Sequence, residues 1–290
     1  MACQIEDRRV TTTNFENRYA IGPNEVKQMD TAQLRDAFLA PKLMQADQVS
    51  WIYTHYERFM VGGAVPVNAE LALETLDALK AEYFLFSREI GIINVGGDGY
   101  VIADGERFEM QYKDTLYLGK GTKDVVFGSS SSEQPAHFYL NSAPAHKSYP
   151  NTKIPVAKAN VLHMGDLTTS NQRDINQTMI NSVVKTCQLQ MGITCLNTGS
   201  VWNTMPAHQH DRRNEVYFYF EVPEQQAVCH FMGEPTETRH IWVQNEQAVI
   251  SPPWSIHSGC GTQNYSFIWG MAGENLDYDD MDKYAPSELR

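Results

Sequence analysis

Short apolar runs separated by glycine-rich turns fill most of the sequence from Tyr83 onward. Residues 90–95 lead into Gly96-Gly-Asp-Gly, residues 100–103 lead into Asp-Gly, and similar runs occupy residues 114–118, 124–128 and 137–140. Runs of this length, spaced about ten residues apart and bounded by turn residues, predict short strands joined by hairpins. Because the pattern resumes at Cys187 and continues to Gly273, we expect a mainly β chain with antiparallel sandwiches or barrels and a few short helices.

The first part of the chain carries more varied signals. Asp30 precedes a run that ends before Pro41, which predicts a capped helix. Residues 49–62 are rich in β-branched and aromatic side chains and predict strand structure that stops at Gly62-Gly63. The leucines of residues 71–81 have helical spacing, so a second short helix is expected there.

Three prolines, at positions 144, 150 and 155, indicate a crossover at residues 144–166 between two β-rich halves. We therefore divide the chain into an N-terminal arm (1–29), a first half without metal ligands (30–150) and a second half with a metal site and an acidic tail (151–290). Residues 167–185 are polar, and strands are expected to resume at Cys187. The acidic residues 277–282 predict either a solvated tail or a lid.

Charge and cysteine usage exclude several classes of function. The net charge of −12 argues against binding to nucleic acid or to an anionic membrane, both of which need a basic surface. The five cysteines are scattered and lack CxxC spacing, so they predict thiols in a reducing cytoplasm. The N-terminus has no apolar signal core, and no apolar stretch approaches transmembrane length. A cytoplasmic enzyme of small-molecule metabolism fits these features.

Two histidines, His208 and His210, stand two residues apart in front of the apolar run that Glu215 begins. On a strand, residues two apart point to the same side, so both imidazoles can bind one ion, and Glu215 can face them from a neighbouring strand. His257 follows 42 residues after Glu215. Three imidazoles and a carboxylate predict a transition-metal site, and this ligand set suits Zn²⁺, Fe²⁺, Mn²⁺ or Ni²⁺.

An HxH pair alone is a weak signal. The competing interpretation is that the pair lies on the surface after Pro206 and that His257 packs beside Trp254. Four ligand-type residues with strand texture on both sides favour the metal site.

The two β-rich halves can be aligned as a weak internal repeat. The alignment sets Glu82, Phe84, Glu89 and Asp124 of the first half opposite His208, His210, Glu215 and His257 of the second. A phenylalanine cannot bind a metal ion, so we expect one working metal site, in the second half, and a structural first half.

Longer motifs around the ligands carry a family resemblance. They are Trp202-Asn-Thr-Met-Pro-Ala-His-Gln-His-Asp-Arg-Arg-Asn-Glu215, Asn245-Glu-Gln-Ala-Val-Ile-Ser-Pro-Pro-Trp-Ser-Ile-His257 and Phe267-Ile-Trp-Gly-Met271, with Arg88-Glu-Ile-Gly-Ile-Ile-Asn94 in the first half. The ligand spacing is typical of a cupin barrel. The motifs together closely resemble the 5-keto-4-deoxyuronate isomerase family from about Asp30 to Arg290, and the first 25 or so residues look like an extension.

The resemblance implies a two-domain cupin-like (bicupin) fold and one Zn²⁺ per chain, bound by His208, His210, Glu215 and His257. It also implies conversion of 5-dehydro-4-deoxy-D-glucuronate to 3-deoxy-D-glycero-2,5-hexodiulosonate, after lyases have cleaved pectin or related uronate polymers. It further implies a homo-oligomer, expected to be a hexamer.

A ketol-isomerase of this kind needs a base and a group that binds the substrate carboxylate. Glu215 either binds the metal only or also acts as the base, and metal-bound hydroxide is the alternative base. The candidates for the carboxylate are Arg173 and Arg239, with Arg212 and Arg213 as neighbours of which one must point away. The other candidate substrate-binding residues are polar or aromatic: Gln188, Gln190, Tyr217 and Trp269. A surface or intersubunit ion pair explains each arginine at least as well, and core packing explains Tyr217 and Trp269 equally well.

Two other functions stay open from the residues themselves. A metal-dependent cupin dioxygenase uses similar ligands, and a non-catalytic sugar-binding cupin would hold the metal without turnover. Metal analysis, oxygen consumption and turnover on uronates discriminate between them.

Overall fold

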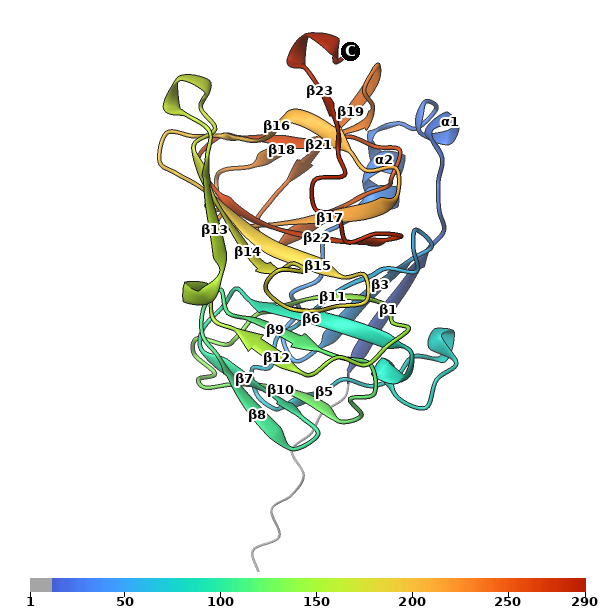
Figure 1. The fold of residues 1–290 in the computed structure, drawn as a ribbon, viewed down its shortest axis with the longest axis vertical. Helices are drawn as coiled ribbons and strands as arrows, with labels where there is room; N and C mark the ends of the chain where they lie inside the picture. The colour runs from blue at the N-terminus through green and yellow to red at the C-terminus, as the bar shows by residue number, and fades with distance from the viewer. Residues whose placement is uncertain (1–11) are drawn as a thin grey trace, which may run out of the picture.

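Four β-sheets are stacked as layers along the long axis of the molecule (Figure 1). The computed structural model describes residues 12–290, so residues 1–11 of the expected arm lie outside the described part. Two seven-stranded sheets, which we call the first and second inner sheets, meet at the centre. A four-stranded first outer sheet covers one of them, and a five-stranded second outer sheet covers the other. The prediction of a mainly β fold with a few short helices is confirmed.

The first inner sheet has the order β1-β3-β4-β11-β6-β9-β12, and the first outer sheet has the order β5-β10-β7-β8. β1 pairs with β3 in parallel, and the other strand pairs of these two sheets are antiparallel. The strands are β1 (Thr13–Arg18), β3 (Val49–Thr54), β4 (Met60–Ala64), β5 (Leu71–Ala72), β6 (Arg88–Asn94), β7 (Gly99–Ala103), β8 (Glu106–Met110), β9 (Thr115–Leu118), β10 (Val125–Ser129), β11 (Phe138–Pro144) and β12 (Thr152–Ile154).

The second inner sheet has the order β13-β14-β15-β22-β17-β20-β2, and the second outer sheet has the order β19-β18-β21-β16-β23. The strands are β2 (Leu39–Ala40), β13 (Asn160–Met164), β14 (Arg173–Met179), β15 (Gln190–Leu196), β16 (Trp202–Gln209), β17 (Arg213–Phe220), β18 (Val228–Glu234), β19 (Glu237–Val243), β20 (Gln247–Ser251), β21 (His257–Gly261), β22 (Ser266–Gly273) and β23 (Asp282–Tyr284). We propose that each pair of inner and outer sheets is one cupin half, and the arrangement of the four sheets supports this proposal.

The helices are short. α1 spans Pro23–Val26 and α2 spans Thr31–Phe38, and the 3-10 turns are Asp77–Leu79, Phe84–Phe86, Val156–Lys158, Leu167–Thr169 and Pro286–Glu288. α2 is the helix predicted from the sequence, and Asp30 caps it by accepting from the backbone N–H of Gln33 at 2.8 Å. Leu34 and Phe38 of α2 pack into the core of the second half, although they fall within residues 30–150, which the sequence assigned to the first half. None of the helices within residues 12–290 has the length and apolar character needed to cross a membrane.

The helix expected at residues 71–81 is wrong. Leu71 and Ala72 form β5, which pairs with β10, and only residues 77–79 make a 3-10 turn. Leu71 and Leu73 bury their side chains in the core of the first half, while Ala72 between them is more exposed. The spacing of these leucines therefore follows the two-residue period of a strand, and pairing with β10 overrides the local helical pattern.

The expectation that strands resume only at Cys187 is also wrong. The polar residues 173–179 form β14, and residues 160–164, within the expected crossover, form β13. Arg173 and Ile175 of β14 face a cavity rather than a closed core. A strand whose side chains line a cavity need not show the apolar alternation that marks other strands.

β17 lies between two layers and is buried along its whole length. Val216 and Phe218 point to the centre of the molecule, where Phe218 stacks on Tyr139 of the first half with ring centroids 4.4 Å apart. Tyr217 and Tyr219 point the other way, into the space between the second inner and outer sheets. Glu215 shares their side by strand alternation, as predicted, so the β17 register directs this carboxylate into the second half.

The internal repeat is visible in the sheet orders, because β6 and β17 occupy the same place in their sheets, as do β9 and β20. The aligned glutamates, however, point in opposite senses. Glu89 lies on the central side of β6, where it accepts from the Tyr117 hydroxyl and from the backbone N–H groups of residues 187–189. The alignment is therefore offset by one residue at this strand, and a one-residue offset moves a side chain to the other face.

Candidate metal centre

The structure brings the four predicted ligand residues together inside the second half. His208 lies near the end of β16, His210 just beyond it, Glu215 on β17, and His257 at the start of β21. His208 and His257 are direct cross-strand partners. One ligand atom from each of the four residues lies within 4.8 Å of all the others, and within residues 12–290 this is the group of His, Cys, Asp and Glu side chains with that geometry.

The imidazoles turn one nitrogen toward the carboxylate and the other away from it. Glu215 Oε2 lies 3.0 Å from His210 Nε2 and 2.9 Å from His257 Nε2. On the far sides of the rings, His210 Nδ1 lies 2.7 Å from the Asp280 carbonyl oxygen and His257 Nδ1 lies 3.1 Å from Ser251 Oγ. Partners at Nδ1 leave both Nε2 lone pairs free to bind a metal ion, which is how ligand histidines are usually oriented.

Burial and mutual contact set the charges of the cluster. Burial alone would raise the pKa of Glu215, but the facing imidazoles of His257 and His210 lower this pKa well below its ordinary value. Burial lowers the pKa of His257, and burial together with the neighbouring imidazoles lowers that of His208 well below its ordinary value. An ionised carboxylate beside neutral imidazoles is the protonation state in which these groups bind a metal.

The donor set fits a divalent transition metal. The buried His257 Nε2 atom approaches Glu215 Oε2 at 2.9 Å without the alignment of a good hydrogen bond, and it faces the centre of the cluster. A metal ion there would satisfy this nitrogen, and three imidazoles with one carboxylate are a common ligand set for such ions.

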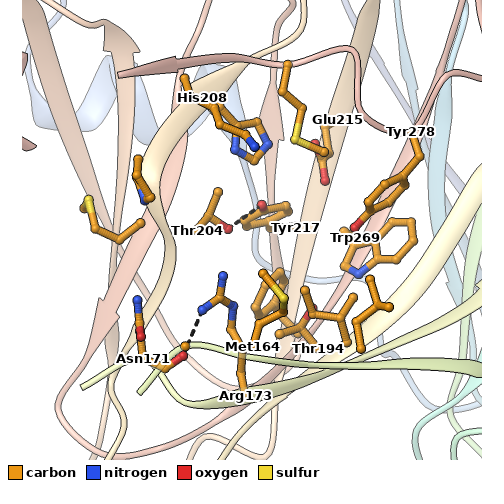
Figure 2. A pocket seen from close by; sticks show the side chains of 18 of the residues that line it. Met164, Asn171, Arg173, Thr194, Thr204, His208, Glu215, Tyr217, Trp269 and Tyr278 are labelled. Carbon is orange, nitrogen blue, oxygen red and sulfur yellow. Dashed lines mark hydrogen bonds between the residues drawn. The ribbon is translucent and has the colours of Figure 1, made fainter. Parts of the chain in front are cut away.

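A cavity of about 400 Å³ adjoins the cluster (Figure 2). The strands β13 to β17, β22 and β23, together with the chain that leads into β23, contribute its lining. The residues include Leu162, Met164, Asn171, Arg173, Thr194, Thr204, His208, His210, Glu215, Tyr217, Phe267, Trp269, Met271, Tyr278, Asp279, Met281 and Lys283. The acidic end of the chain is therefore a wall of this cavity, which favours the second of the two roles predicted for it.

Three of the predicted substrate-binding residues line the cavity. Figure 2 shows the Arg173 guanidinium directed into the cavity, at the opposite end from His208 and Glu215, with Thr204 and Tyr217 between them. Arg173 Nη1 donates to the Asn171 carbonyl oxygen at 2.8 Å. The Tyr217 hydroxyl lies 2.8 Å from Thr204 Oγ1. The third residue, Trp269, forms the wall beside Tyr278, with ring centroids 5.5 Å apart.

Gln188 and Arg239 lie elsewhere. Gln188 precedes β15 at the junction of the halves, where its Nε2 donates to the Pro144 carbonyl oxygen. Arg239 is on β19 at the edge of the second outer sheet and pairs with Glu237 at 2.9 Å. Neither residue lines the cavity.

Gln190 lies behind the metal ligands rather than in the cavity wall, and it contacts Arg213. Arg213 Nη1 donates to Gln190 Oε1 at 3.0 Å, and Nη2 donates to the Asp280 carbonyl oxygen at 3.0 Å. The neighbouring Arg212 points outward and pairs with Glu274 at 3.1 Å. One arginine of the pair thus points in and one points out, as predicted.

The sequence did not indicate Thr204, Tyr278 or Lys283 as residues of the site, since nothing in their local pattern marks them.

Comparisons with known proteins agree on one group of relatives. A family model described as "KduI/IolB family" matches residues 38–285. A 4-deoxy-L-threo-5-hexosulose-uronate ketol-isomerase of Formosa agariphila is 61% identical over 279 residues, which is 96% of this chain and 100% of that protein. One of Bacteroides fragilis is 56% identical over 278 residues, covering 96% and 99%. The solved structure of an IolB-like protein of Salmonella typhimurium LT2 matches with a TM-score of 0.64 and 18% identity. The match covers 78% of this chain and 86% of that chain, and it shows that the two proteins share a fold.

Proposed function

The chain belongs to the KduI/IolB family, and from that premise we propose that it is a 4-deoxy-L-threo-5-hexosulose-uronate ketol-isomerase. The reaction would convert 5-dehydro-4-deoxy-D-glucuronate to 3-deoxy-D-glycero-2,5-hexodiulosonate in the breakdown of pectin and related uronate polymers. One structural observation carries the proposal: a four-ligand cluster and an arginine face one cavity from opposite ends (Figure 2).

The substrate has the same two-ended chemistry. Its carboxylate is at one end of the six-carbon chain, and the aldehyde at C1 with the hydroxyl at C2 is at the other. We propose that Arg173 binds the carboxylate, because a guanidinium can hold it through two hydrogen bonds. Arg173 donates to the Asn171 carbonyl, and no carboxylate within residues 12–290 forms an ion pair with it.

The metal that we propose is one Zn²⁺ per chain, held by His208, His210, Glu215 and His257. When bound there, the ion would supply Lewis-acid chemistry toward the substrate oxygens. The ligand set alone also suits other divalent ions, so metal analysis of the purified protein is the direct check.

The protein's own residues would position the substrate and move the protons. Isomerisation takes a proton from C2 and delivers one to C1, which leaves a ketone at C2 and a primary alcohol at C1. Glu215 Oε2 lies 3.0 Å from His210 Nε2 and 2.9 Å from His257 Nε2, at the centre of the ligand cluster, which supports a role as ligand only. The other carboxylate of the cavity wall is Asp279, which is therefore the residue to test as the base.

Tyr217 would orient the middle of the substrate. Burial raises the pKa of its phenol well above the ordinary value, so the hydroxyl stays protonated and can donate to a substrate oxygen. Trp269 and Phe267 supply apolar walls that exclude water from the enediolate.

The test is to incubate the purified protein with unsaturated uronate that a lyase has produced, and to identify the product by NMR. Formation of the 2,5-diketo acid without oxygen uptake supports the isomerase. Oxygen consumption would indicate the dioxygenase, and metal retention without turnover would indicate a sugar-binding protein. With deuterium at C2, loss of label to solvent supports an enediol, whereas full retention at C1 would indicate a hydride shift.

We also propose a cytoplasmic homo-oligomer, with the hexamer expected from the family resemblance. The four cysteines within the described residues are free thiols, in keeping with a reducing compartment. β13 exposes Val161 (40%) and Met164 (47%), and Leu167 beyond it is 57% exposed. Val161 and Met164 point to opposite faces of β13, and Met164 also lines the cavity, so the hexamer rests on the family resemblance and light scattering of the purified protein measures the assembly.

A further inference from the structure

Arg213 is a fully buried cation whose hydrogen-bond acceptors are neutral groups. Its side chain is 1% exposed. The guanidinium donates to the Gln190 side chain and to the Asp280 carbonyl, each at 3.0 Å, and approaches the Tyr278 carbonyl at 3.5 Å. The carboxylates of Glu215, Asp280 and Asp277 stabilise this charge at longer range, and among the described residues none forms an ion pair with it. Burying a charge without a direct ion-pair partner costs folding free energy. Such a residue is expected to do something that an apolar side chain could not do.

Arg213 and Gln190 together hold the segment of residues 276–283, which we call the C-terminal wall. Gln190 Nε2 donates to the Leu276 carbonyl at 2.8 Å, and Arg213 holds the Asp280 carbonyl four residues later. Tyr278 and Asp279, between these two points, line the cavity. At its far end the wall continues into β23, which pairs with β16 beside the ligand His208.

The same Asp280 carbonyl contacts a metal ligand. It lies 2.7 Å from His210 Nδ1, while Arg213 Nη2 lies 3.1 Å from that nitrogen. A carbonyl oxygen can accept from both donors at once. When His210 donates its Nδ1–H to Asp280, its Nε2 lone pair faces the cluster; in the other tautomer a hydrogen occupies that place. In the metal-binding tautomer His210 Nδ1 carries a hydrogen and cannot accept from Arg213, so the Arg213 guanidinium is left to donate to Gln190 and to the Asp280 carbonyl, and it thereby holds the acceptor of the Nδ1–H in place.

We propose that Arg213 and Gln190 are positioning residues that couple docking of the C-terminal wall to retention of the metal ion by the four-ligand cluster. This proposal rests on the proposed function, because the Zn²⁺ ion that it concerns is the one proposed there. Because coupling is reciprocal, the docked wall strengthens metal binding, and the bound metal holds the wall in place by the same factor. Asp279 and Tyr278 are then in the cavity when the metal is bound.

The experiment measures both directions of this coupling without substrate. Zn²⁺ affinity is measured by competition with a chromophoric chelator. Wall docking is measured by the rate at which trypsin cuts after Lys283 and releases residues 284–290, followed by mass spectrometry with and without Zn²⁺. In the unaltered protein we expect Zn²⁺ to slow this release about tenfold. In Arg213→Met we expect Zn²⁺ affinity to fall about tenfold or more and the protection by Zn²⁺ to disappear.

Two matched controls lie close to the tested residues in the sequence, Arg212 next to Arg213 and Gln188 two residues before Gln190. Arg212→Met removes an arginine that pairs with Glu274 on the surface, and Gln188→Met removes a glutamine that contacts Pro144. Both should keep the affinity and the protection of the unaltered protein. Gln190→Met should weaken both in the same direction as Arg213→Met, and it carries the test if Arg213→Met does not fold. Arg213→Lys keeps the charge but not the forked geometry, so it should restore part of the affinity.

Normal Zn²⁺ affinity in folded Arg213→Met and Gln190→Met would overturn the proposal. A loss of Zn²⁺ affinity with normal protection by Zn²⁺ against trypsin would also overturn the proposal. The substitution would then perturb His210 as a metal ligand without any coupling to the C-terminal wall. Failure of the unaltered protein to isomerise uronate would count against the proposed function and would leave these two readouts intact.

Discussion

Replacing Arg173 with methionine should lower kcat/KM strongly, mainly by weakening substrate binding. Arg173 is the arginine that the structure directs into the cavity opposite the metal ligands (Figure 2). Methionine keeps much of the side-chain volume and removes the charge. The substrate carboxylate would then enter a half-buried end of the cavity without its partner.

The magnitude follows from the hydrogen bonds that would be lost. A hydrogen bond that involves a charged group contributes about 1.5–3 kcal/mol, so two bonds in a partly desolvated site are worth about 3 kcal/mol or more. At about 1.4 kcal/mol per tenfold change, kcat/KM should fall at least about 100-fold. Because the carboxylate is remote from C1 and C2, most of the loss should be a rise in KM.

The assay is steady-state kinetics on lyase-generated uronate, with Arg239→Met and Arg212→Met as controls. Arg239→Met removes the same charge from the edge of β19, and Arg212→Met removes it from the surface pair with Glu274. Because these charges are far from the cavity and screened by salt, each control should change kcat/KM less than about twofold. Arg173→Lys should lose about tenfold, because lysine keeps the charge but not the fork. A kcat/KM within threefold of normal in Arg173→Met, or a large loss in Arg239→Met, would refute this assignment.

Three further predictions concern the metal, pH and the structural role of the first half. His210→Ala should reduce the bound Zn²⁺ measured by mass spectrometry and abolish isomerisation, with an unchanged circular dichroism spectrum; full activity without metal would contradict the Lewis-acid role. Burial lowers the pKa of His230 to about 3, so the folded chain does not take up the proton that the unfolded chain binds below about pH 6.5. Metal-free protein should therefore lose about 1.4 kcal/mol of unfolding free energy from His230 alone by pH 5.5. Denaturant titration should show a smaller loss in the His230→Gln variant. Equal losses in the two proteins would contradict this reasoning. Glu89→Gln should lower the unfolding free energy by about 2–3 kcal/mol at unchanged Zn²⁺ content, because the buried carboxylate accepts from three backbone N–H groups and Tyr117; loss of metal instead would mean that the first half contributes to the site.

The metal cluster and much of the strand pattern could be predicted because both depend on local periodicity. His208 and His210 share a side because they are two residues apart, and Glu215, Tyr217 and Tyr219 share a side of β17 for the same reason. The family resemblance, confirmed by relatives over nearly the whole chain, rests on the long motifs around these positions.

The rest of the site depends on long-range pairing that local patterns do not reveal. Arg173 and Arg239 both stand in polar segments, and only the sheet order places one in the cavity and the other at an edge. Tyr278 reaches the site because buried side chains on β15 and β17 hold the backbone around it. The leucines at positions 71 and 73 fit a helix or a strand equally well until β10 pairs beside them.

The central claim is that the second half isomerises a uronate at one metal centre per chain. The direct test is to strip the protein with a chelator, return Zn²⁺ in steps and measure isomerase activity at each step. We predict no activity in the stripped protein and a linear recovery that ends at one Zn²⁺ per chain, with no recovery in Glu215→Ala. Full activity in the stripped protein, or recovery that continues to two Zn²⁺ per chain, would contradict the claim.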